Sequence, residues 1–170
     1  MKRILMSLTL AGLAALLCAQ VMAANATATA KVGATIVVPI AIEKTQDLEF
    51  GSIAPDVAAG TVAVSTDNVR TRTGNVNLLT VGNAPQAAGF MVMGSPAATY
   101  TITLPTETSV IRDAGDAKML VDGFVSNPGG AGVLDAKGNQ ALAVGATLHV
   151  DASQRAGRYM GAFDVTVEYN

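Results

Sequence analysis

The chain has 170 residues, of which 50% are apolar but only 4% aromatic and 14% charged, and its formal net charge is -2. This length fits a single domain with a core of aliphatic side chains, and so much apolar surface excludes a disordered chain. Lysine and arginine are few and scattered singly, so the sequence offers no basic face for phosphates. Nucleic acid is therefore excluded as the main partner.

The first 23 residues have the pattern of a secretory signal peptide. Basic residues precede an apolar run over residues 4–18, and the segment ends in Val21-Met22-Ala23, with suitable residues at the -3 and -1 positions. We expect residues 1–23 to be removed on export, and no stable membrane insertion afterwards, because no later segment approaches spanning length. Cleavage would remove Cys18, the only cysteine, so the exported protein cannot contain a disulfide.

Beyond the signal segment, apolar and polar residues alternate with a period of two, which predicts short, half-buried strands. Turn-forming residues separate these runs at intervals of roughly ten residues, the spacing typical of an antiparallel β-sandwich. The expected strands are 60–65, 75–78, 89–93, 99–104, 118–122 and 146–150, and the expected turns are 94–96, 113–116, 127–130 and 137–139.

At the N-terminal end of the exported chain the alternation is unusually long. Every even position from Ala26 to Ile42 is apolar, while the odd positions are mostly threonine, lysine, glycine and proline. We divide this stretch into an extension, residues 24–33, and a domain, residues 34–170, whose first strand is expected at Ile36–Ile42. Pro39 cannot donate to a strand ladder and predicts a bend or an edge.

The C-terminal end shows a second long alternation. Odd positions from Tyr159 to Tyr169 form one face, and the pattern predicts an unbroken strand that runs to the last residue but one. A long free edge with one apolar face invites pairing with another chain. Two interpretations stay open: both terminal strands pair within one sandwich, or the edge receives a strand from another molecule.

This C-terminus resembles that of fimbrial subunits assembled by the chaperone–usher pathway. In that family the last strand has a glycine fourteen residues from the end and an aromatic residue at the penultimate position, and here these positions hold Gly157 and Tyr169. The N-terminal alternation is similar to that of colonisation-factor type pilins. The middle of the chain resembles a family of short secreted bacterial proteins known as a domain of unknown function. Two departures are the missing disulfide and Gly33, which lies out of phase with the apolar positions.

The resemblance implies an immunoglobulin-like β-sandwich of the pilin type, lacking one strand, that polymerises by donor-strand complementation into a surface fimbria. The implied partners are copies of itself or related subunits, a periplasmic chaperone and an outer-membrane usher, and the implied location is the cell surface after passage through the periplasm. The implied donor residues are Ala26, Ala28, Ala30 and Val32, and the implied groove and chaperone-binding residues are Gly157, Tyr159, Phe163, Val165, Val167 and Tyr169. The alternative is a self-complete secreted or cell-surface binding domain that does not polymerise.

The sequence contains no motif that indicates an enzyme, a cofactor or a metal site. His149 is the only histidine and lies in an alternating run, which favours a surface strand position over a catalytic one. Two loops, Asp113–Asp116 and Asp135–Asn139, have oxygen ligands that calcium could use, but neither fits the spacing of the EF-hand loop. Aspartate and glycine are also the ordinary residues of turns, so we expect both loops to be structural.

Overall fold

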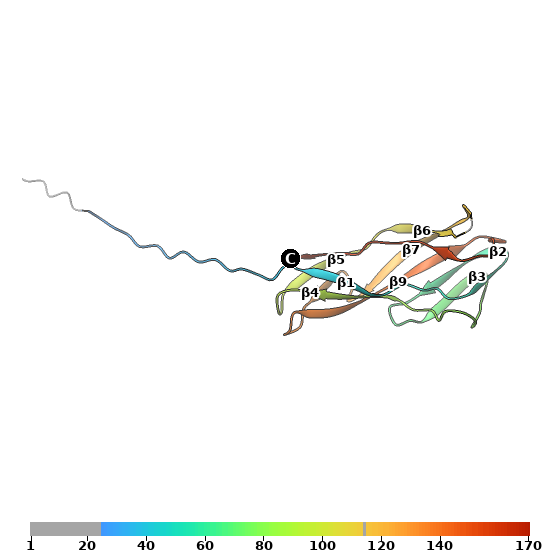
Figure 1. The fold of residues 1–170 in the computed structure, drawn as a ribbon, viewed down its shortest axis with the longest axis horizontal. Coiled ribbons are helices and arrows are strands. Elements are labelled where there is room, and N and C mark those ends of the chain that lie inside the picture. The colour runs from blue at the N-terminus through green and yellow to red at the C-terminus, as the bar shows by residue number, and fades with distance from the viewer. Residues whose placement is uncertain (1–24, 114) are drawn as a thin grey trace, which may run out of the picture. The chain divides into compact units, whose positions relative to one another are not determined.

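The computed structural model describes residues 25–113 and 115–170. Within these ranges all regular secondary structure is β-strand and every strand pair is antiparallel, as predicted (Figure 1). The predicted signal peptide, residues 1–23, lies outside the described residues. The strands are β1 (Ala41–Gln46), β2 (Ile53–Val64), β3 (Arg70–Leu78), β4 (Ala88–Met93), β5 (Thr99–Thr103), β6 (Glu107–Arg112), β7 (Lys118–Asn127), β8 (Ala131–Val133), β9 (Asn139–Val150), β10 (Tyr159–Met160) and β11 (Thr166–Tyr169).

The strands form two sheets in a β-sandwich-like arrangement. The larger sheet has eight strands, in the order β1-β4-β9-β7-β6-β10, with β2 pairing to β9 and β3 to β2. The smaller sheet has three strands, in the order β11-β5-β8. Strand β9 pairs with β4 through its first half, with β2 through its second half, and with β7 on its other side. It is therefore the strand around which the larger sheet is organised.

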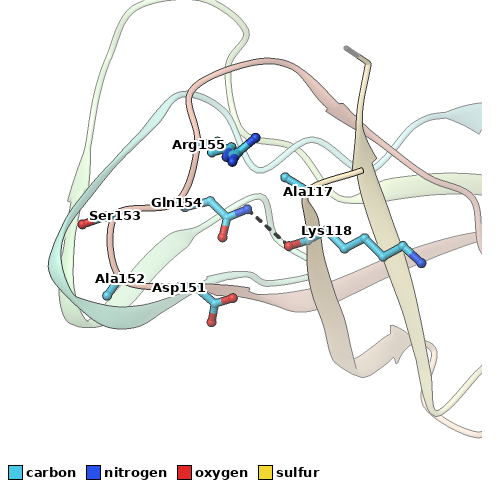
Figure 2. A pocket seen from close by; sticks show the side chains of 7 residues that line it. All are labelled: Ala117, Lys118, Asp151, Ala152, Ser153, Gln154 and Arg155. Carbon is cyan, nitrogen blue, oxygen red and sulfur yellow. Dashed lines mark hydrogen bonds between the residues drawn. The ribbon is translucent and has the colours of Figure 1, made fainter. Parts of the chain in front are cut away.

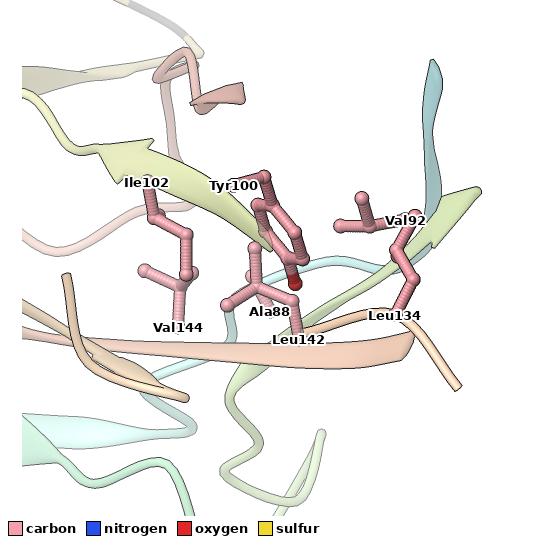
Figure 3. Packing of buried hydrophobic residues seen from close by; sticks show 7 residues of the cluster. All are labelled: Ala88, Val92, Tyr100, Ile102, Leu134, Leu142 and Val144. Atoms are coloured by element: carbon pink, nitrogen blue, oxygen red, sulfur yellow. The ribbon is translucent and has the colours of Figure 1, made fainter. Parts of the chain in front are cut away.

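One core cluster lies between the two sheets. Tyr100 and Ile102 from β5 face Leu142 and Val144 from β9 (Figure 3). Tyr100 is fully buried, and its hydroxyl donates a hydrogen bond of 2.8 Å to Oε1 of Gln140. The burial of an aromatic ring whose polar end has a partner stabilises the contact between the sheets. The buried members are Ala88, Val92, Tyr100, Ile102, Leu134, Leu142 and Val144.

A second cluster lies beneath β2, β3, β7 and the second half of β9. Its members are almost all valine, alanine and leucine, consistent with the aliphatic core expected from composition. Strand β9 contributes to both clusters, so its two halves connect them. The buried members are Val62, Val76, Val121, Ala146, Leu148 and Val150.

The described chain comprises two units, of which residues 36–170 form the compact one. Residues 25–35 carry no assigned helix or strand, and all of their side chains are exposed. Val32 is 99% exposed, although valine is usually buried in folded proteins. The alternating extension therefore has a solvated apolar face.

The first strand of the domain begins later than the sequence predicts. The expected strand was Ile36–Ile42, but β1 begins at Ala41. Pro39 has no N–H to donate to a ladder, and side chains bind the backbone of Val38: its N–H donates to Oγ of Ser95 at 2.9 Å. These two features delay the ladder until the chain has passed Pro39.

The C-terminal strand is not unbroken, contrary to the prediction. β10 pairs with β6 in the larger sheet, whereas β11 pairs with β5 in the smaller one. Residues 161–165 connect β10, which pairs with β6, to β11, which pairs with β5, and Gly161 still lies against Ser109 and Val110 of β6. In the connection between β5 and β6, Pro105 has no N–H to donate to a ladder. The hydroxyl of Thr108 donates to the carbonyl of Ala162 at 2.8 Å and takes the place of a ladder bond. The alternation continues through this crossing, but the hydrogen-bonding partner changes.

Six predicted strands coincide with parts of β2, β3, β4, β5, β7 and β9. The sequence analysis missed β6 and β8. In β6 the exposed and half-buried residues alternate regularly, so its period-two signal was present but overlooked. Strand β8 has only three residues, Ala131–Val133, which is too short for periodicity to be recognised.

Replacing Leu142 with alanine tests whether the cluster between the sheets holds the fold together. Leu142 is 1% exposed, so we expect Leu142→Ala to lower the free energy of unfolding by about 2–5 kcal/mol through lost burial and a residual cavity. Urea titration measures this change. Val57→Ala is the matched control, because Val57 is 82% exposed and its truncation should cost less than about 0.5 kcal/mol. Equal losses in the two variants would contradict this role.

Candidate functional site

The C-terminal segment presents one half-buried apolar face. Phe163, Val165, Val167 and Tyr169 are half-buried, while the residues between them are exposed. All four pack against the buried cluster between the sheets. The alternation of apolar residues in the sequence thus corresponds to an alternation of half-buried and exposed side chains. Thr166–Tyr169 forms a regular antiparallel ladder with β5.

Strand β11 lies at the edge of the smaller sheet. Among the described residues it pairs only with β5, so the backbone groups on its other side have no strand partner. We call this outward side of β11, together with Phe163 and Val165 before it, the C-terminal edge. The larger sheet ends nearby in β1, which pairs only with β4 within the described part of the chain. Two sheet edges therefore approach each other without pairing.

Aromatic rings fill the interior behind the C-terminal edge. The ring of Phe163 lies 4.9 Å from that of Phe124, centroid to centroid, and 6.3 Å from that of Phe90 in an edge-on arrangement. Such pairs stabilise by about 0.5–1.5 kcal/mol beyond the area they bury. Half-buried Ile40 and Ile42 pack against the same cluster from the other sheet edge. The surface between the two edges is therefore apolar.

The hydroxyl of Tyr169 closes one end of this region. It accepts a hydrogen bond from the N–H of Ser95 at 2.7 Å and donates one to the carbonyl of Val38, also at 2.7 Å. The N–H of Val38 in turn donates to Oγ of Ser95 at 2.9 Å. We call these three hydrogen bonds the Tyr169 clasp. They join the last strand, the loop after β4 and the segment that leads into β1.

The structure does not bring all the implied groove residues together. Tyr159 lies in β10, which belongs to the larger sheet, and Gly157 lies in the bend just before it, whereas Val167 and Tyr169 lie in the smaller sheet. The hydroxyl of Tyr159 donates to the carbonyl of Arg155 at 2.7 Å and accepts from Nε2 of Gln154 at 2.8 Å. Gly157 has a φ of +153°, and a side chain there would press against Arg112. Both residues thus have local structural roles.

The implied donor residues are all accessible. Ala26, Ala28, Ala30 and Val32 are exposed and have no assigned secondary structure. In an extended chain they would share one face, with Thr27, Thr29 and Lys31 on the other. The role assigned to them stays a prediction.

A polar hollow of about 290 Å³ lies between the start of β7 and the loop after β9 (Figure 2). The amide Nε2 of Gln154 donates to the carbonyl of Lys118 at 3.2 Å, which ties this loop to β7. The open surface is lined by one acidic and two basic side chains, those of Asp151, Lys118 and Arg155. We assign the hollow a structural origin, because hydrogen bonds among its lining residues hold the loop: besides the bond to Lys118, the N–H of Gln154 donates to the carbonyl of Asp151 at 3.2 Å. Its lining residues are Ala117, Lys118, Asp151, Ala152, Ser153, Gln154 and Arg155.

His149 has a carboxylate partner that the sequence analysis did not identify. Its Nε2 lies 2.8 Å from Oδ1 of Asp122 on β7, and both side chains are more than one-third exposed. The two residues are 27 positions apart, so only the pairing of β7 with β9 brings them together. Among the described residues no group of three or more histidine, cysteine, aspartate or glutamate side chains is placed to hold a metal ion.

The Asp135 loop is a hydrogen-bonded turn. Oδ1 of Asp135 accepts the N–H of Lys137 at 2.7 Å and that of Asn139 at 2.9 Å. These backbone donors, Asn139 foremost, lower the pKa of the Asp135 carboxyl below its ordinary value. The carboxylate thus has a structural role in the turn, as the sequence analysis expected. The second loop, Asp113–Asp116, includes residue 114, which lies outside the described residues.

Comparison with protein-family models identifies the class of this chain. A model described as a domain of unknown function, DUF4402, matches residues 40–169. The chain belongs to this family. The match begins just before β1 and ends within the last strand, so it covers the β-sandwich-like domain. Comparison with curated proteins and with solved structures gives no match.

In the described part of the chain, no helix is long and apolar enough to cross a membrane.

The Asp135 turn predicts a stability change that depends on pH. Because the pKa of Asp135 is lowered in the folded state, its stabilising contribution is present above the unfolded pKa of about 3.9 and is lost as pH falls through the folded pKa. We expect Asp135→Asn to destabilise the protein at pH 7, and this difference to shrink in acid. Urea unfolding at several pH values measures it.

Asp67→Asn serves as a control for the change in net charge, because Asp67 lies in another exposed turn. A difference between wild type and Asp135→Asn that stays constant from pH 7 down to the acid range, or that matches the control throughout, would show that the carboxylate does not stabilise the turn.

Proposed function

We propose that this protein is a structural subunit of a bacterial surface fimbria, of the immunoglobulin-like pilin type, and that it polymerises by donor-strand complementation. In this function the C-terminal edge of one copy receives residues 25–33 of another. The observation that carries the proposal is the one-sided pairing of β11, whose half-buried apolar face belongs to the core while its outer backbone edge has no strand partner in the described chain.

The second support is the state of the extension. Its apolar face is solvated, and Val32 alone would contribute roughly 1.5–3 kcal/mol on burial. The alanines contribute less each, so a whole donor strand supplies on the order of 10 kcal/mol before entropic costs. Backbone hydrogen bonds to the outer side of β11 add to this, as in other cases of strand addition. Joints of this strength are long-lived.

The alternation also fixes the register of the joint. Side chains of a strand point to opposite faces in turn, so a slip of one residue would move Thr27, Thr29 and Lys31 toward the apolar interior. Burying the charge of Lys31 without a partner is strongly unfavourable. The donor strand therefore has only registers in which Ala26, Ala28, Ala30 and Val32 face inward.

In this function the C-terminal edge of an unassembled subunit must be covered, because it can pair with other copies of the chain. We propose that a periplasmic chaperone pairs with the C-terminal edge until an outer-membrane usher exchanges it for the extension of the next subunit. An open apolar edge exposed in the periplasm would otherwise template uncontrolled pairing. The proposed location is the cell surface, after export directed by residues 1–23.

Single substitutions on the two faces of the extension test this function. Ala30→Asp places a carboxylate on the face proposed to be buried, whereas Thr29→Asp places the same group on the opposite face. We expect Ala30→Asp to abolish fibres in the producing cells and Thr29→Asp to retain most of them, because an unpaired buried charge costs far more than an exposed one. Electron microscopy of the cell surface and sedimentation of the assembled material measure the difference.

Deletion of residues 25–33 completes the test, and we expect it to leave only unassembled protein. Fibres formed by the deletion variant, or equal assembly of the two aspartate variants, would refute donor-strand complementation by this extension. A wild-type chain that purifies as a stable monomer and in which residues 25–33 resist proteolysis would instead establish the self-complete surface domain as the function.

A further inference from the structure

The Tyr169 clasp connects the proposed acceptor and the proposed donor within one molecule. Tyr169 is the last residue of β11, the strand whose outer edge is open. Val38 lies in the segment between the extension and β1, which begins at Ala41, and we call this segment, residues 34–40, the root of the extension. The hydroxyl that joins them donates to the carbonyl of Val38 at 2.7 Å, across 131 positions of sequence. The two functional segments thus share one hydrogen-bonded group.

The surroundings of the hydroxyl are shaped to accept it. Gly94 leaves the space that the Tyr169 hydroxyl occupies, since a Cβ at this position would collide with the hydroxyl and lie 2.9 Å from Leu134. The neighbouring Ser95 supplies both its N–H to the hydroxyl and its Oγ to the N–H of Val38. Every polar group of the clasp therefore has a partner, while the ring itself packs against the buried cluster.

The clasp depends on a short edge strand. Strand β11 has four residues, and among the described residues it has a ladder on one side only. Edge strands with few hydrogen bonds open more readily than the rest of a fold. Each opening of β11 withdraws the hydroxyl from Val38.

We propose that pairing of the extension of a second copy with the C-terminal edge strengthens the Tyr169 clasp and thereby fixes the root of the extension of the receiving subunit. This inference rests on the proposed function. A donor strand gives β11 a second ladder and suppresses its opening, so the hydroxyl stays on Val38. Because such coupling is reciprocal, a fixed root also raises the affinity of the edge for its donor.

The coupling gives assembly a direction. In a subunit whose C-terminal edge is empty, the hydrogen bond from Tyr169 to Val38 opens often, and the root of the extension is mobile. In a subunit whose edge has received a donor strand, this hydrogen bond persists and the root is fixed. Growth is then favoured at the subunit that has just been joined. Tyr169 acts here as a positioning residue, because its hydroxyl acts through Val38.

Hydrogen exchange at the amide of Val38 tests the inference directly, since that N–H donates within the clasp. The experiment uses the full chain, kept dilute, with and without a synthetic peptide of residues 25–35, and fluorescence anisotropy of the labelled peptide measures its affinity. In the wild type we expect the peptide to slow exchange at Val38 by roughly fivefold or more, the usual lower range of allosteric coupling. In Tyr169→Phe we expect no such response and a peptide affinity lower by a similar factor.

Tyr100→Phe is the matched control. Tyr100 is paired with Tyr169 in the β5–β11 ladder, and its hydroxyl binds Gln140 instead of Val38. We expect the response of Val38 to the peptide to persist in this variant. Peptide binding that leaves Val38 unchanged, or a response of equal size in Tyr169→Phe, would overturn the coupling while the proposed function stands. Absence of peptide binding in the wild type would refute the proposed function and the coupling together.

Discussion

A β-strand pairs the backbone groups on both its sides with other strands only when it has two neighbours, and among the described residues β11 has one. The unpaired side of β11 matters for the fold because this strand also contributes side chains to the interior. Its side chains pack against the cluster that joins the two sheets, and Phe163 just before it contacts two other phenylalanines. The fold thus places part of its core on a strand whose outer edge has no strand partner among the described residues.

The rest of the domain limits the cost of that arrangement. Strand β9 runs through both core clusters and pairs along both of its sides, and none of the buried core residues of the described chain lies in β11. The Tyr169 clasp then fastens the end of β11 to the loop after β4. The strand that contributes to both core clusters, β9, is thus distinct from β11, whose outer side has no strand partner among the described residues.

Sequence periodicity predicted which segments form strands. It did not predict which distant strand each segment pairs with. The run Thr99–Leu104 alternates cleanly, and all of it but Leu104 forms β5, because burial on one face leaves a period of two in the sequence. The break at residues 161–165 leaves no such trace, since alternation reports which side chains are buried and not which strand supplies the hydrogen bonds. The sequence signal for this break was Pro105, which lies in the connection between β5 and β6.

The candidate site follows the same rule. The half-buried face of Phe163, Val165, Val167 and Tyr169 could be predicted from the sequence, and burial in the structure agrees with it. The clasp could not, because it joins Val38, Ser95 and Tyr169 through contacts that only the folded chain creates. The partner of His149 was hidden for the same reason. Tyr159 shares the alternation of the last strand but lies in the larger sheet, and Gly157 lies in the bend before it.

The hydroxyl that holds Val38 has a mechanical consequence. Tension applied through residues 25–35 enters the domain at the root of β1, where Tyr169 and Ser95 bear it before the ladder between β1 and β4 does. Part of the load thus passes into the last strand, at the opposite end of the sequence. A pull on one terminus of the chain is resisted by the other.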